Sequence, residues 1–443
     1  MKREIESKLK NWKSSKRRKP LVMMGARQVG KTWLMQEFGK HNFARTHYFS
    51  FDAQKSLASL FNDNIDPKDL MLKLSALSDS KIDTKNDLVI FDEIQECPNA
   101  LNSLKYFQEN CPELAVMAAG SLLGVRLSGR RGEKSKSEAP ARSYPVGKVE
   151  LLDMEPMNFA EFLREYDERL CSFYMGISGR EEIPEIFHKK LLDVYDLYLF
   201  TGGMPEVVSE YLENHDPQVA RKQQRDLIAL YEDDVVKYNG EVDAAKILAV
   251  LRSVVPQLAK ANEKFVYGAL RNGARAREYE NAIEWLVSAR MIRRVNNLTA
   301  MRFPLAAYEE RSAFKIYHLD VGLLREAAGI PQSQLATNAS FDFKGPLVEN
   351  YVLQQLFGHG EGKAYYYSER SNKEIDFVLQ LGSDIAPIEV KAGTDKLSPS
   401  FKSYVSVNQP KYAVRFSRRN LCKDGGFVNI PLYLASKFEE CFK

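Results

Sequence analysis

The stretch that decides the expected fold is Gly25-Ala26-Arg27-Gln28-Val29-Gly30-Lys31-Thr32, which fits the pattern GxxxxGK[ST] at every fixed position. An apolar run, Leu21 to Met24, comes before it, and a segment with helical spacing, Lys31 to Lys40, comes after it. Glycines let backbone N–H groups turn inward around phosphate groups, and the N-terminus of the next helix adds a partial positive charge. The stretch therefore predicts a strand, a phosphate-binding loop and a helix in succession.

The two side chains at the end of this loop have distinct expected roles. Lys31 should reach the β- and γ-phosphates of ATP, and Thr32 should give its hydroxyl to Mg²⁺. The rest of the nucleotide-binding loop comprises Gly25, Ala26, Arg27, Gln28, Val29 and Gly30. The alternative is a chance match in a glycine-containing loop, but the strand and helix on either side favour the nucleotide site. We therefore expect ATP and Mg²⁺ as cofactors.

A second apolar run, Leu88 to Phe91, ends in the adjacent pair Asp92 and Glu93. A carboxylate at this strand end can hold Mg²⁺ through water, which is the role expected of Asp92. Glu93 can polarise the attacking water, and the alternative for it is a solvated strand-end carboxylate. Because one group serves the metal and the other the nucleophile, the pair favours ATP hydrolysis over a P-loop kinase of a small substrate.

Further candidates follow the strand expected at Leu114 to Ala119. Ser121 is either a sensor of the γ-phosphate or an ordinary turn serine. Arg126 and Lys148 are either transition-state cations, supplied in cis or by a neighbouring subunit, or solvated loop charges. The basic loop Gly124 to Lys148 also carries Arg130, Arg131, Lys134, Lys136 and Arg142.

The composition is that of an ordinary globular chain, and its 443 residues predict roughly two to four domains. Because 63 Lys and Arg stand against 59 Asp and Glu, the net charge is only +4, and any nucleic-acid-binding surface must be local. Five cysteines without a CxxC pair and six histidines argue against a zinc site and fit a reducing cytosol. A charged N-terminus and the lack of an apolar run of about 18 residues predict a cytoplasmic protein without a secretory signal or membrane span.

The spacing of apolar residues predicts an α/β fold. Short apolar runs, including Thr46 to Phe51, alternate with helical patterns over residues 1–150, which predicts a mostly parallel sheet covered on both faces. Helical patterns at Phe159 to Tyr166 and Ile186 to Leu199 then predict a helical subdomain over residues 151–240.

Residues 241–310 are expected to form a winged-helix-like module. Helical patterns precede two expected strands, Met291 to Val295 and Ala300 to Phe303, around Asn296-Asn297. The arginines of this module either contact phosphates or pair with nearby glutamates on a solvated helical face. The arginines are Arg271, Arg275, Arg277, Arg290, Arg293 and Arg294, and the glutamates are Glu278, Glu280 and Glu284.

Residues 311–443 are expected to form a second α/β domain with a charged constellation. Asp376 followed along the chain by Glu389-x-Lys391 resembles the PD-(D/E)xK nuclease core. In such a core, carboxylates on neighbouring strands hold a divalent metal beside a phosphodiester, and the lysine stabilises charge or positions hydroxide. Glu389 and Lys391 are two apart on a strand and so face one side, and Glu349, on the helix Pro346 to Phe357, could add a third carboxylate. The alternative is a half-buried strand with alternating charge.

Strings spread over nearly the whole chain together resemble one known family. They are the phosphate-loop stretch, Ile90-Phe91-Asp92-Glu93-Ile94-Gln95, Tyr144-Pro145-Val146-Gly147-Lys148-Val149, Pro156-Met157-Asn158-Phe159-Ala160-Glu161-Phe162-Leu163, Thr201-Gly202-Gly203-Met204-Pro205-Glu206 and Phe314-Lys315-Ile316-Tyr317-His318-Leu319-Asp320-Val321-Gly322-Leu323-Leu324. The set resembles the prokaryotic AAA-type ATPases that carry a C-terminal domain of unknown function with a nuclease-like fold. One departure is Gly120-Ser121-Leu122-Leu123-Gly124, where related sequences often have a more polar Thr-Gly-Ser-Ser string.

The resemblance implies a P-loop NTPase core of the AAA type over residues 1–150, a helical lid over 151–240, a winged-helix-like middle over 241–310 and a restriction-endonuclease-like α/β end over 311–443. The implied catalytic set is Lys31, Glu93 and Ser121 in the core and Asp376, Glu389 and Lys391 at the end. The implied metal ligands are Thr32 and Asp92 in the core and Glu349, Asp376 and Glu389 at the end.

Two functional hypotheses follow. In the first, ATP hydrolysis drives or gates a C-terminal domain that binds or processes DNA. In the second, the protein is an ATP-dependent regulatory switch whose C-terminal domain is catalytically inactive and binds a protein partner, because a fold does not confer its function. The sequence leaves the oligomeric state and the type of nucleic acid open.

Overall fold

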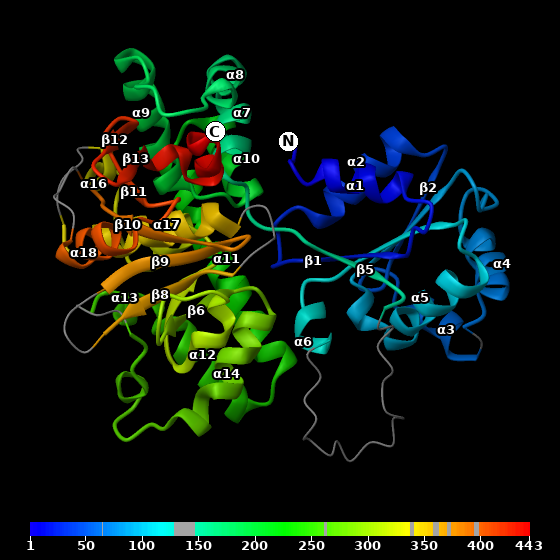
Figure 1. The fold of residues 1–443 in the computed structure, drawn as a ribbon. Coiled ribbons are helices and arrows are strands. Elements are labelled where there is room, and N and C mark those ends of the chain that lie inside the picture. The colour runs from blue at the N-terminus through cyan, green and yellow to red at the C-terminus, as the bar shows by residue number, and fades with distance from the viewer. Residues whose placement is uncertain are drawn as a thin grey trace. The chain divides into compact units, whose positions relative to one another are not determined.

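The computed structural model describes residues 1–63, 65–127, 147–260, 264–336, 341–357, 363–369, 374–393 and 398–443. It divides into two compact units (Figure 1). The N-terminal unit consists of Lys2–Glu155 with Ser288–Arg290, and the C-terminal unit of Met1, Pro156–Val287 and Met291–Lys443. Among the residues that the structure describes, none of the helices combines the length and the apolarity that crossing a bilayer requires.

The N-terminal unit is built on a five-stranded sheet in the order β2-β3-β4-β1-β5, in which every pair of neighbours is parallel. The strands are β1 (Leu21–Met24), β2 (Thr46–Ser50), β3 (Leu88–Asp92), β4 (Ala115–Ala119) and β5 (Glu150–Asp153). The predicted parallel sheet is therefore confirmed, and the four predicted strands lie within a residue of their observed bounds. The fifth strand, β5, was not predicted.

Helices cover both faces of this sheet (Figure 1). One face carries α2 (Lys31–Asn42), and the other carries α3 (Leu60–Asp63), α4 (Pro67–Leu77) and α5 (Pro98–Asn110). Phe91 of β3 is fully buried at the second face, where its ring lies about 6 Å from those of Phe61 and Phe107. Aromatic side chains bury large areas and favour such edge-on and tilted pairs, so this cluster fixes the helices against the sheet.

The strand order determines which residues can meet. Because all five strands are parallel, their carboxyl ends lie along one edge of the sheet, and β4 lies between β1 and β3. The phosphate loop after β1, the Asp92-Glu93 pair at the end of β3 and Ser121 after β4 are therefore brought to the same edge, where open α/β sheets bind their ligands.

The C-terminal unit contains a mixed eight-stranded sheet in the order β12-β13-β11-β10-β9-β8-β6-β7. Its strands are β6 (Ile292–Leu298), β7 (Glu309–His318), β8 (Tyr365–Ser368), β9 (Glu374–Leu381), β10 (Asp384–Val390), β11 (Val414–Ser417), β12 (Cys422–Asp424) and β13 (Phe427–Pro431). The helices α17 (Lys344–Phe357) and α18 (Pro399–Asn408) contact β10 and β9, respectively. The sequence predicts the helix Pro346 to Phe357 and the strands Ala364 to Tyr367, Glu374 to Leu379 and Ile385 to Val390, and all four are confirmed within two residues of their bounds.

The hairpin predicted for a separate winged-helix-like module belongs to this sheet instead. Its first strand, β6, pairs with β7 on one side and in parallel with β8 on the other. The second strand begins at Glu309 and not at Ala300, since Pro304 cannot donate a ladder hydrogen bond. Asn296 and Asn297 do not form the turn, because their side chains donate to Glu309 and Glu310 from within the strand. The expected boundary at residue 310 therefore falls inside β7.

The helices expected to form a separate subdomain pack in the same unit as this sheet. They are α7 (Phe159–Tyr166), α8 (Glu168–Gly176), α9 (Glu185–Thr201), α10 (Pro205–Asn214) and α11 (Pro217–Tyr238). The helices that follow them, beyond the predicted subdomain, are α12 (Glu241–Arg252), α13 (Val254–Leu258), α14 (Ala276–Ser288), α15 (Val321–Ala327) and α16 (Gln332–Ala336). The backbone N–H of Phe159 donates to the side-chain oxygen of Gln355 on α17 at 2.7 Å. Helices and sheet thus share one interior.

Two of the strings noted in the sequence meet at Asp320, which is fully buried. Its carboxylate accepts hydrogen bonds from the backbone N–H of Gly203 at 2.7 Å and of Leu323 at 3.1 Å, and from the Gln354 side chain at 2.9 Å. A Cβ on Gly202 would lie 2.1 Å from the same carboxylate. The Thr201–Glu206 string and the Phe314–Leu324 string are therefore two sides of one buried contact.

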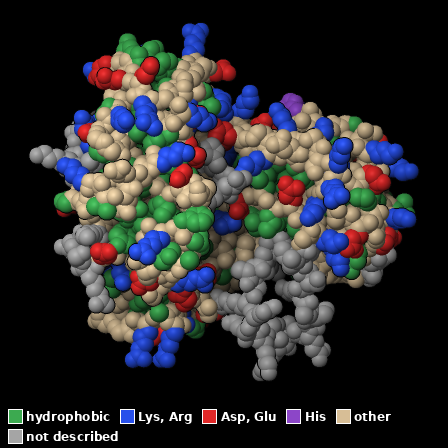
Figure 2. Space-filling view, viewed as in Figure 1, with side chains coloured by type: hydrophobic (Ala, Val, Ile, Leu, Met, Phe, Trp, Pro, Cys, Tyr) green, Lys and Arg blue, Asp and Glu red, His purple; other side chains and the backbone are tan. Residues whose placement is uncertain are grey.

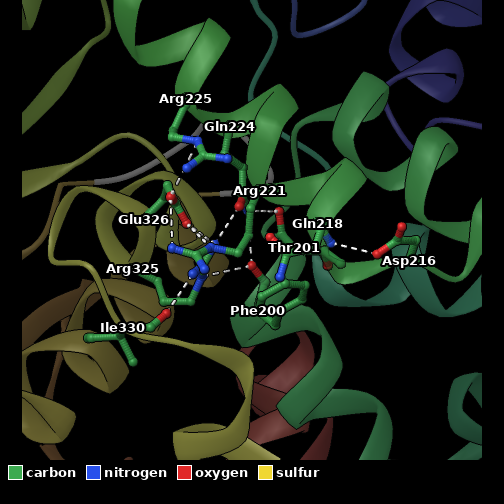
Figure 3. Close-up of polar contacts among 10 residues, drawn as sticks. All are labelled: Phe200, Thr201, Asp216, Gln218, Arg221, Gln224, Arg225, Arg325, Glu326 and Ile330. Atoms are coloured by element: carbon green, nitrogen blue, oxygen red, sulfur yellow. Dashed lines mark hydrogen bonds and ion pairs between the residues drawn. The ribbon is translucent and has the colours of Figure 1, made fainter.

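A second buried polar centre joins α9, α11 and α15 (Figure 3). The guanidinium of Arg325 is fully buried and donates to the carbonyl oxygens of Phe200 at 3.2 Å and Ile330 at 2.6 Å, and to Gln224. It also forms an ion pair with Glu326 at 2.9 Å. Burial lowers the pKa of Arg325 to about 10, so the group remains charged at neutral pH and its contacts are charge-assisted.

Replacing Arg325 with Met should lower the free energy of unfolding by about 3 kcal/mol, because the buried oxygens of Ile330 and Gln224 lose the donor that Arg325 supplies and Glu326 keeps only Arg221 as a close ion-pair partner. The matched control is Arg225→Met, since Arg225 is exposed and its Nε lies as far as 3.9 Å from the same carboxylate. This control should lower the free energy of unfolding by no more than about 0.5 kcal/mol. Urea unfolding of the full chain measures both, and equal losses would contradict a structural role for Arg325.

Candidate active site

The phosphate loop has a backbone that only small or specially placed residues allow. Gly25 has a φ of 151° and Gly30 a φ of 95°, both in the region that favours glycine. A Cβ on Gly25 would lie 2.3 Å from the carbonyl oxygen of Met154, the residue after β5. Arg3 fixes the loop from outside, since its guanidinium donates to the carbonyl oxygens of Val29 at 2.9 Å and Glu155 at 2.6 Å. The fifth strand and Arg3, neither of which the sequence singled out, therefore hold the loop in shape.

Lys31, at the start of α2, lies inside this loop. Its ammonium is buried and donates to the carbonyl oxygens of Gly25 at 2.9 Å and Ala26 at 2.7 Å. Burial lowers the pKa of Lys31 to about 8, although the carboxylates of Glu93 and Asp92 act in the opposite direction. The group is thus a partly desolvated cation near the two acidic side chains, as a lysine that binds phosphate requires.

Thr32 and Asp92, predicted as the Mg²⁺ pair, are in direct contact. The Thr32 hydroxyl donates to Asp92 Oδ2 at 2.7 Å. Tyr48 of β2 donates its hydroxyl to the same oxygen at 2.8 Å, and burial together with the Asp92 charge raises the pKa of Tyr48. Tyr48 was not singled out from the sequence, since a tyrosine in a strand with partly alternating burial is usually structural. The carboxylate of Asp92 is thus oriented by one side chain from α2 and one from β2.

Glu93 has a left-handed backbone with φ 49° and ψ 42°, which costs a residue with a side chain roughly 1 kcal/mol or more. Its carboxylate accepts a hydrogen bond from the Gln95 side-chain amide, and Ser121 Oγ lies 3.4 Å from the same oxygen. A Cβ on Gly120 would overlap Gln95 Oε1 at 1.9 Å, so glycine is needed there for close approach. The structure therefore brings Ser121 to Glu93, and adds Gln95, which the sequence did not single out.

These residues fit Mg²⁺ and ATP. The loop around Gly25 packs against Met154 too closely for a Cβ, and Lys31 offers a cation within the loop. Thr32 and Asp92 offer the hydroxyl and carboxylate oxygens that Mg²⁺ prefers. Gln95 Oε1 is fully buried beside Gly120 and accepts no hydrogen bond within the described residues, while the Gln95 amide donates to Glu93, the carboxylate that can accept from a water molecule. Metal, phosphate and water therefore each have suitable groups at this edge of the sheet.

The predicted transition-state cations receive less support. Lys148 forms an ion pair with Glu109 of α5 at 3.0 Å, which favours the loop-charge alternative for it. Arg126 lies in the short helix α6 (Leu123–Leu127). The remaining basic residues of the loop, Arg130, Arg131, Lys134, Lys136 and Arg142, lie outside the described residues, as does the side chain of Arg126.

The C-terminal charged residues come close enough to act on one another. Burial, then the negative charges of Glu349 and Glu389, raise the pKa of Asp376 well above its usual range, while Lys391 and Lys315 oppose this. Asp376 Oδ2 accepts from the backbone N–H of Val390 at 2.7 Å. The sequence prediction that β9, β10 and a helix bring these carboxylates together is thus supported by their mutual electrostatic effect.

The same residues, as arranged, do not fit a divalent metal. Both oxygens of the buried Glu389 are engaged, Oε1 by the backbone N–H of Ser398 at 3.1 Å and by Lys391 at 2.8 Å, and Oε2 by the Ser398 hydroxyl at 3.0 Å. Glu349 accepts from the Tyr317 hydroxyl at 2.9 Å and lies 3.8 Å from Lys315. Within the described ranges, no three His, Cys, Asp or Glu side chains converge on a common point that could hold a metal. Glu389 caps α18 through Ser398 instead.

The arginines proposed as phosphate contacts are partly accounted for by local pairs. Arg294 pairs with Glu280 at 2.7 Å and Glu284 at 2.9 Å, and Arg271 pairs with Glu278 at 3.1 Å. On the face drawn in Figure 2, basic and acidic side chains are interspersed over both units. For Arg271 and Arg294 the structure therefore favours local pairing with glutamates over a phosphate-binding surface, although Arg294 lies in β6 and Arg271 precedes α14, so neither is on a helical face.

Comparison with known families gives three matches along the chain. A family profile described as an AAA domain matches residues 17–163. Two profiles described as domains of unknown function match residues 192–334 (DUF8612) and 344–435 (DUF4143). No curated protein matches this sequence.

Several solved structures are similar at low identity. The Walker-type ATPase paby2304 of Pyrococcus abyssi is 14% identical, with 73% of this chain and 95% of that chain covered and a TM-score of 0.44. The Thermotoga maritima RuvB Holliday junction branch migration motor is 15% identical, with 68% and 89% covered and a TM-score of 0.30. The Aeropyrum pernix Orc1 protein, solved in complex with DNA, is 9% identical, with 75% and 94% covered and a TM-score of 0.29. The family match and the site geometry together identify residues 17–163 as an AAA domain with a phosphate-binding loop.

Proposed function

We propose that the protein binds and hydrolyses ATP at the site between the phosphate loop and Glu93. Two contacts carry this proposal. Thr32 donates a hydrogen bond of 2.7 Å to Asp92. Next to Asp92, the Glu93 carboxylate is oriented by Gln95 and Ser121. A site that only binds a nucleotide would need the Thr32–Asp92 contact and not the oriented Glu93 carboxylate. The oriented Glu93 carboxylate provides a general base for the attacking water molecule.

Each side chain has a separate task in this proposal. The loop N–H groups and Lys31 bind the phosphates and neutralise their charge. When bound, Mg²⁺ would be held by Thr32 and Asp92 and would withdraw charge from the phosphate oxygens. Glu93 accepts a proton from the attacking water, and the Gln95 amide orients Glu93 by donating a hydrogen bond to its carboxylate. Ser121 steadies the Glu93 carboxylate, which is a positioning role.

For the C-terminal unit, the observations favour an ATP-dependent switch with a non-cleaving domain over a nuclease. The support is that both Glu389 oxygens accept hydrogen bonds from Ser398 and one also pairs with Lys391. These contacts connect the charged residues to the start of α18. Lys391 in turn carries a pKa raised by the Asp376 and Glu389 charges against the effect of burial, so it remains a cation that neutralises them. In this proposal the domain binds a protein partner. Coupling to DNA is the competing proposal, and the following experiment separates the two.

Hydrolysis of ATP by the full chain should fall about 100-fold in Glu93→Gln while ATP still binds, because the general base is lost and the phosphate contacts remain. Lys31→Ala should lose ATP binding itself. The matched control is Glu96→Gln, an exposed glutamate three residues further on, which should hydrolyse ATP at the wild-type rate. Steady-state phosphate release measures the rate of ATP hydrolysis by the wild type and the three variants.

The same reactions are run with and without duplex DNA, in Mg²⁺ or Mn²⁺. The switch proposal expects turnover that DNA leaves unchanged and DNA that stays intact. DNA-stimulated turnover would instead support coupling to DNA, and cleavage lost in Asp376→Ala would overturn the non-cleaving domain.

Tyr48→Phe should weaken Mg²⁺-ATP binding about fivefold, because one hydrogen bond to the Asp92 carboxylate is lost. Binding of ATP in EDTA should not change, since the phosphates do not depend on Asp92. Tyr106→Phe, on α5, is the matched control and should bind as the wild type does. Titration calorimetry measures both affinities, and an equal loss with and without metal would argue against a role for Tyr48 in the metal site.

The affinity for ATP should fall as pH rises above about 8, where Lys31 of the free protein loses its proton. Bound phosphates favour the charged form of Lys31. At high pH, where Lys31 of the free protein is neutral, ATP binding must therefore return a proton to its amine. Between pH 7 and 9 the affinity should drop about tenfold. Calorimetry in two buffers of different ionisation enthalpy should show proton uptake that grows over this range, and uptake independent of pH would contradict the assignment.

A further inference from the structure

A pocket of about 400 Å³ lies within the C-terminal unit, among α11, α12, α13 and the ends of β7 and α15. Its walls are mainly apolar and include Ile228, Leu251, Val254, Pro256 and Ala327. Sites for small molecules are typically cavities of this size with apolar walls and a few polar groups. None of the residues proposed for ATP or for the charged C-terminal set lines this pocket.

His318, the last residue of β7, supplies a polar group of this pocket and is only 6% exposed. Its Nδ1 accepts the backbone N–H of Asp320 at 3.4 Å, so the proton of the neutral ring is on Nε2. Burial lowers the pKa of His318 to about 4, and the ring is therefore uncharged at neutral pH. Its Nε2 makes no hydrogen bond within the described residues and is not among their fully buried polar atoms, so its N–H is available to a group in the pocket. An acceptor in the pocket would supply its partner.

The remaining charged residues of the pocket cancel each other. Arg252 donates to Glu232 through two parallel hydrogen bonds of 2.8 and 2.6 Å. The bond to Arg252 lowers the pKa of Glu232, so both groups stay ionised and paired. The arginine is the more exposed partner, with 62% of its side chain accessible. A ligand therefore meets no net charge, and an anionic or cationic ligand would have to break a bidentate pair.

We infer that this pocket binds an uncharged, largely apolar small molecule whose carbonyl or similar acceptor receives a hydrogen bond from Nε2–H of His318. The apolar walls provide the affinity and the histidine provides the orientation. Because the ligand would contact α11, α13 and the end of β7 at once, it would join the helical part of the unit to its sheet. The site is independent of the proposed ATP hydrolysis.

The test uses two probes of matched shape with the full chain, 4-fluoroacetophenone, which carries a carbonyl acceptor, and 4-fluoroethylbenzene, which does not. Fluorine NMR titration should give saturable binding of the ketone with a Kd on the order of 1 mM, about fivefold tighter than that of the hydrocarbon. His318→Phe should remove this preference and leave the hydrocarbon affinity unchanged within about twofold.

Ala327→Trp fills the pocket from an exposed position and should weaken both probes at least fivefold, whereas Val242→Trp, on an exposed part of α12 outside the pocket, should bind both as the wild type does. Circular dichroism and thermal unfolding verify that each variant is folded. The inference is overturned by a lack of saturable ketone binding to the wild type, by undiminished binding to Ala327→Trp, or by a ketone preference that survives in His318→Phe.

Discussion

The parallel order of the N-terminal sheet, with β4 between the phosphate-loop strand and the strand that ends in Asp92, is the constraint on which the ATP site depends. It places a buried lysine, a hydroxyl and two carboxylates along one edge. The contacts that complete the site come from the neighbours of these strands. Tyr48 reaches Asp92 from β2, and Arg3 braces the loop against the segment after β5. The residues that orient the site thus lie outside the phosphate-loop motif.

The C-terminal unit follows a different principle. Its interior is joined by buried charged side chains that are satisfied by backbone groups, such as Asp320 with Gly203 and Arg325 with Phe200. Glu389 belongs to the same class, because Ser398 occupies both of its oxygens. Buried charges stabilise little in themselves, but losing one partner is costly, so such contacts define a unique packing of helices against the sheet. A charged constellation with the spacing of a nuclease core can therefore arise from structural needs.

The sequence predicted the N-terminal unit well because its signals are local. Residues 25–32 and the apolar run before Asp92 each specify a strand end, and helix periodicity supplied α2. It did not predict that Asn296 and Asn297 lie within a strand, since their glutamate partners follow a dozen residues later and only the folded sheet brings them together. Tyr48 was missed for the same reason, since its partner Asp92 follows 44 residues later. Gln95 was missed although it stands two residues after Glu93 in a family-like string, and that spacing was the signal available.

The most direct test of the central claim is Mn²⁺ binding followed by electron paramagnetic resonance, with and without ATP, in the wild type and in Thr32→Ala. Mn²⁺ replaces Mg²⁺ with the same preference for oxygen ligands. If Thr32 and Asp92 hold the metal beside the nucleotide, the wild type should bind Mn²⁺ tightly only when ATP is present, and Thr32→Ala should lose this ATP-dependent binding. Mn²⁺ binding that is the same without ATP, or unchanged in Thr32→Ala, would contradict the assignment of this site.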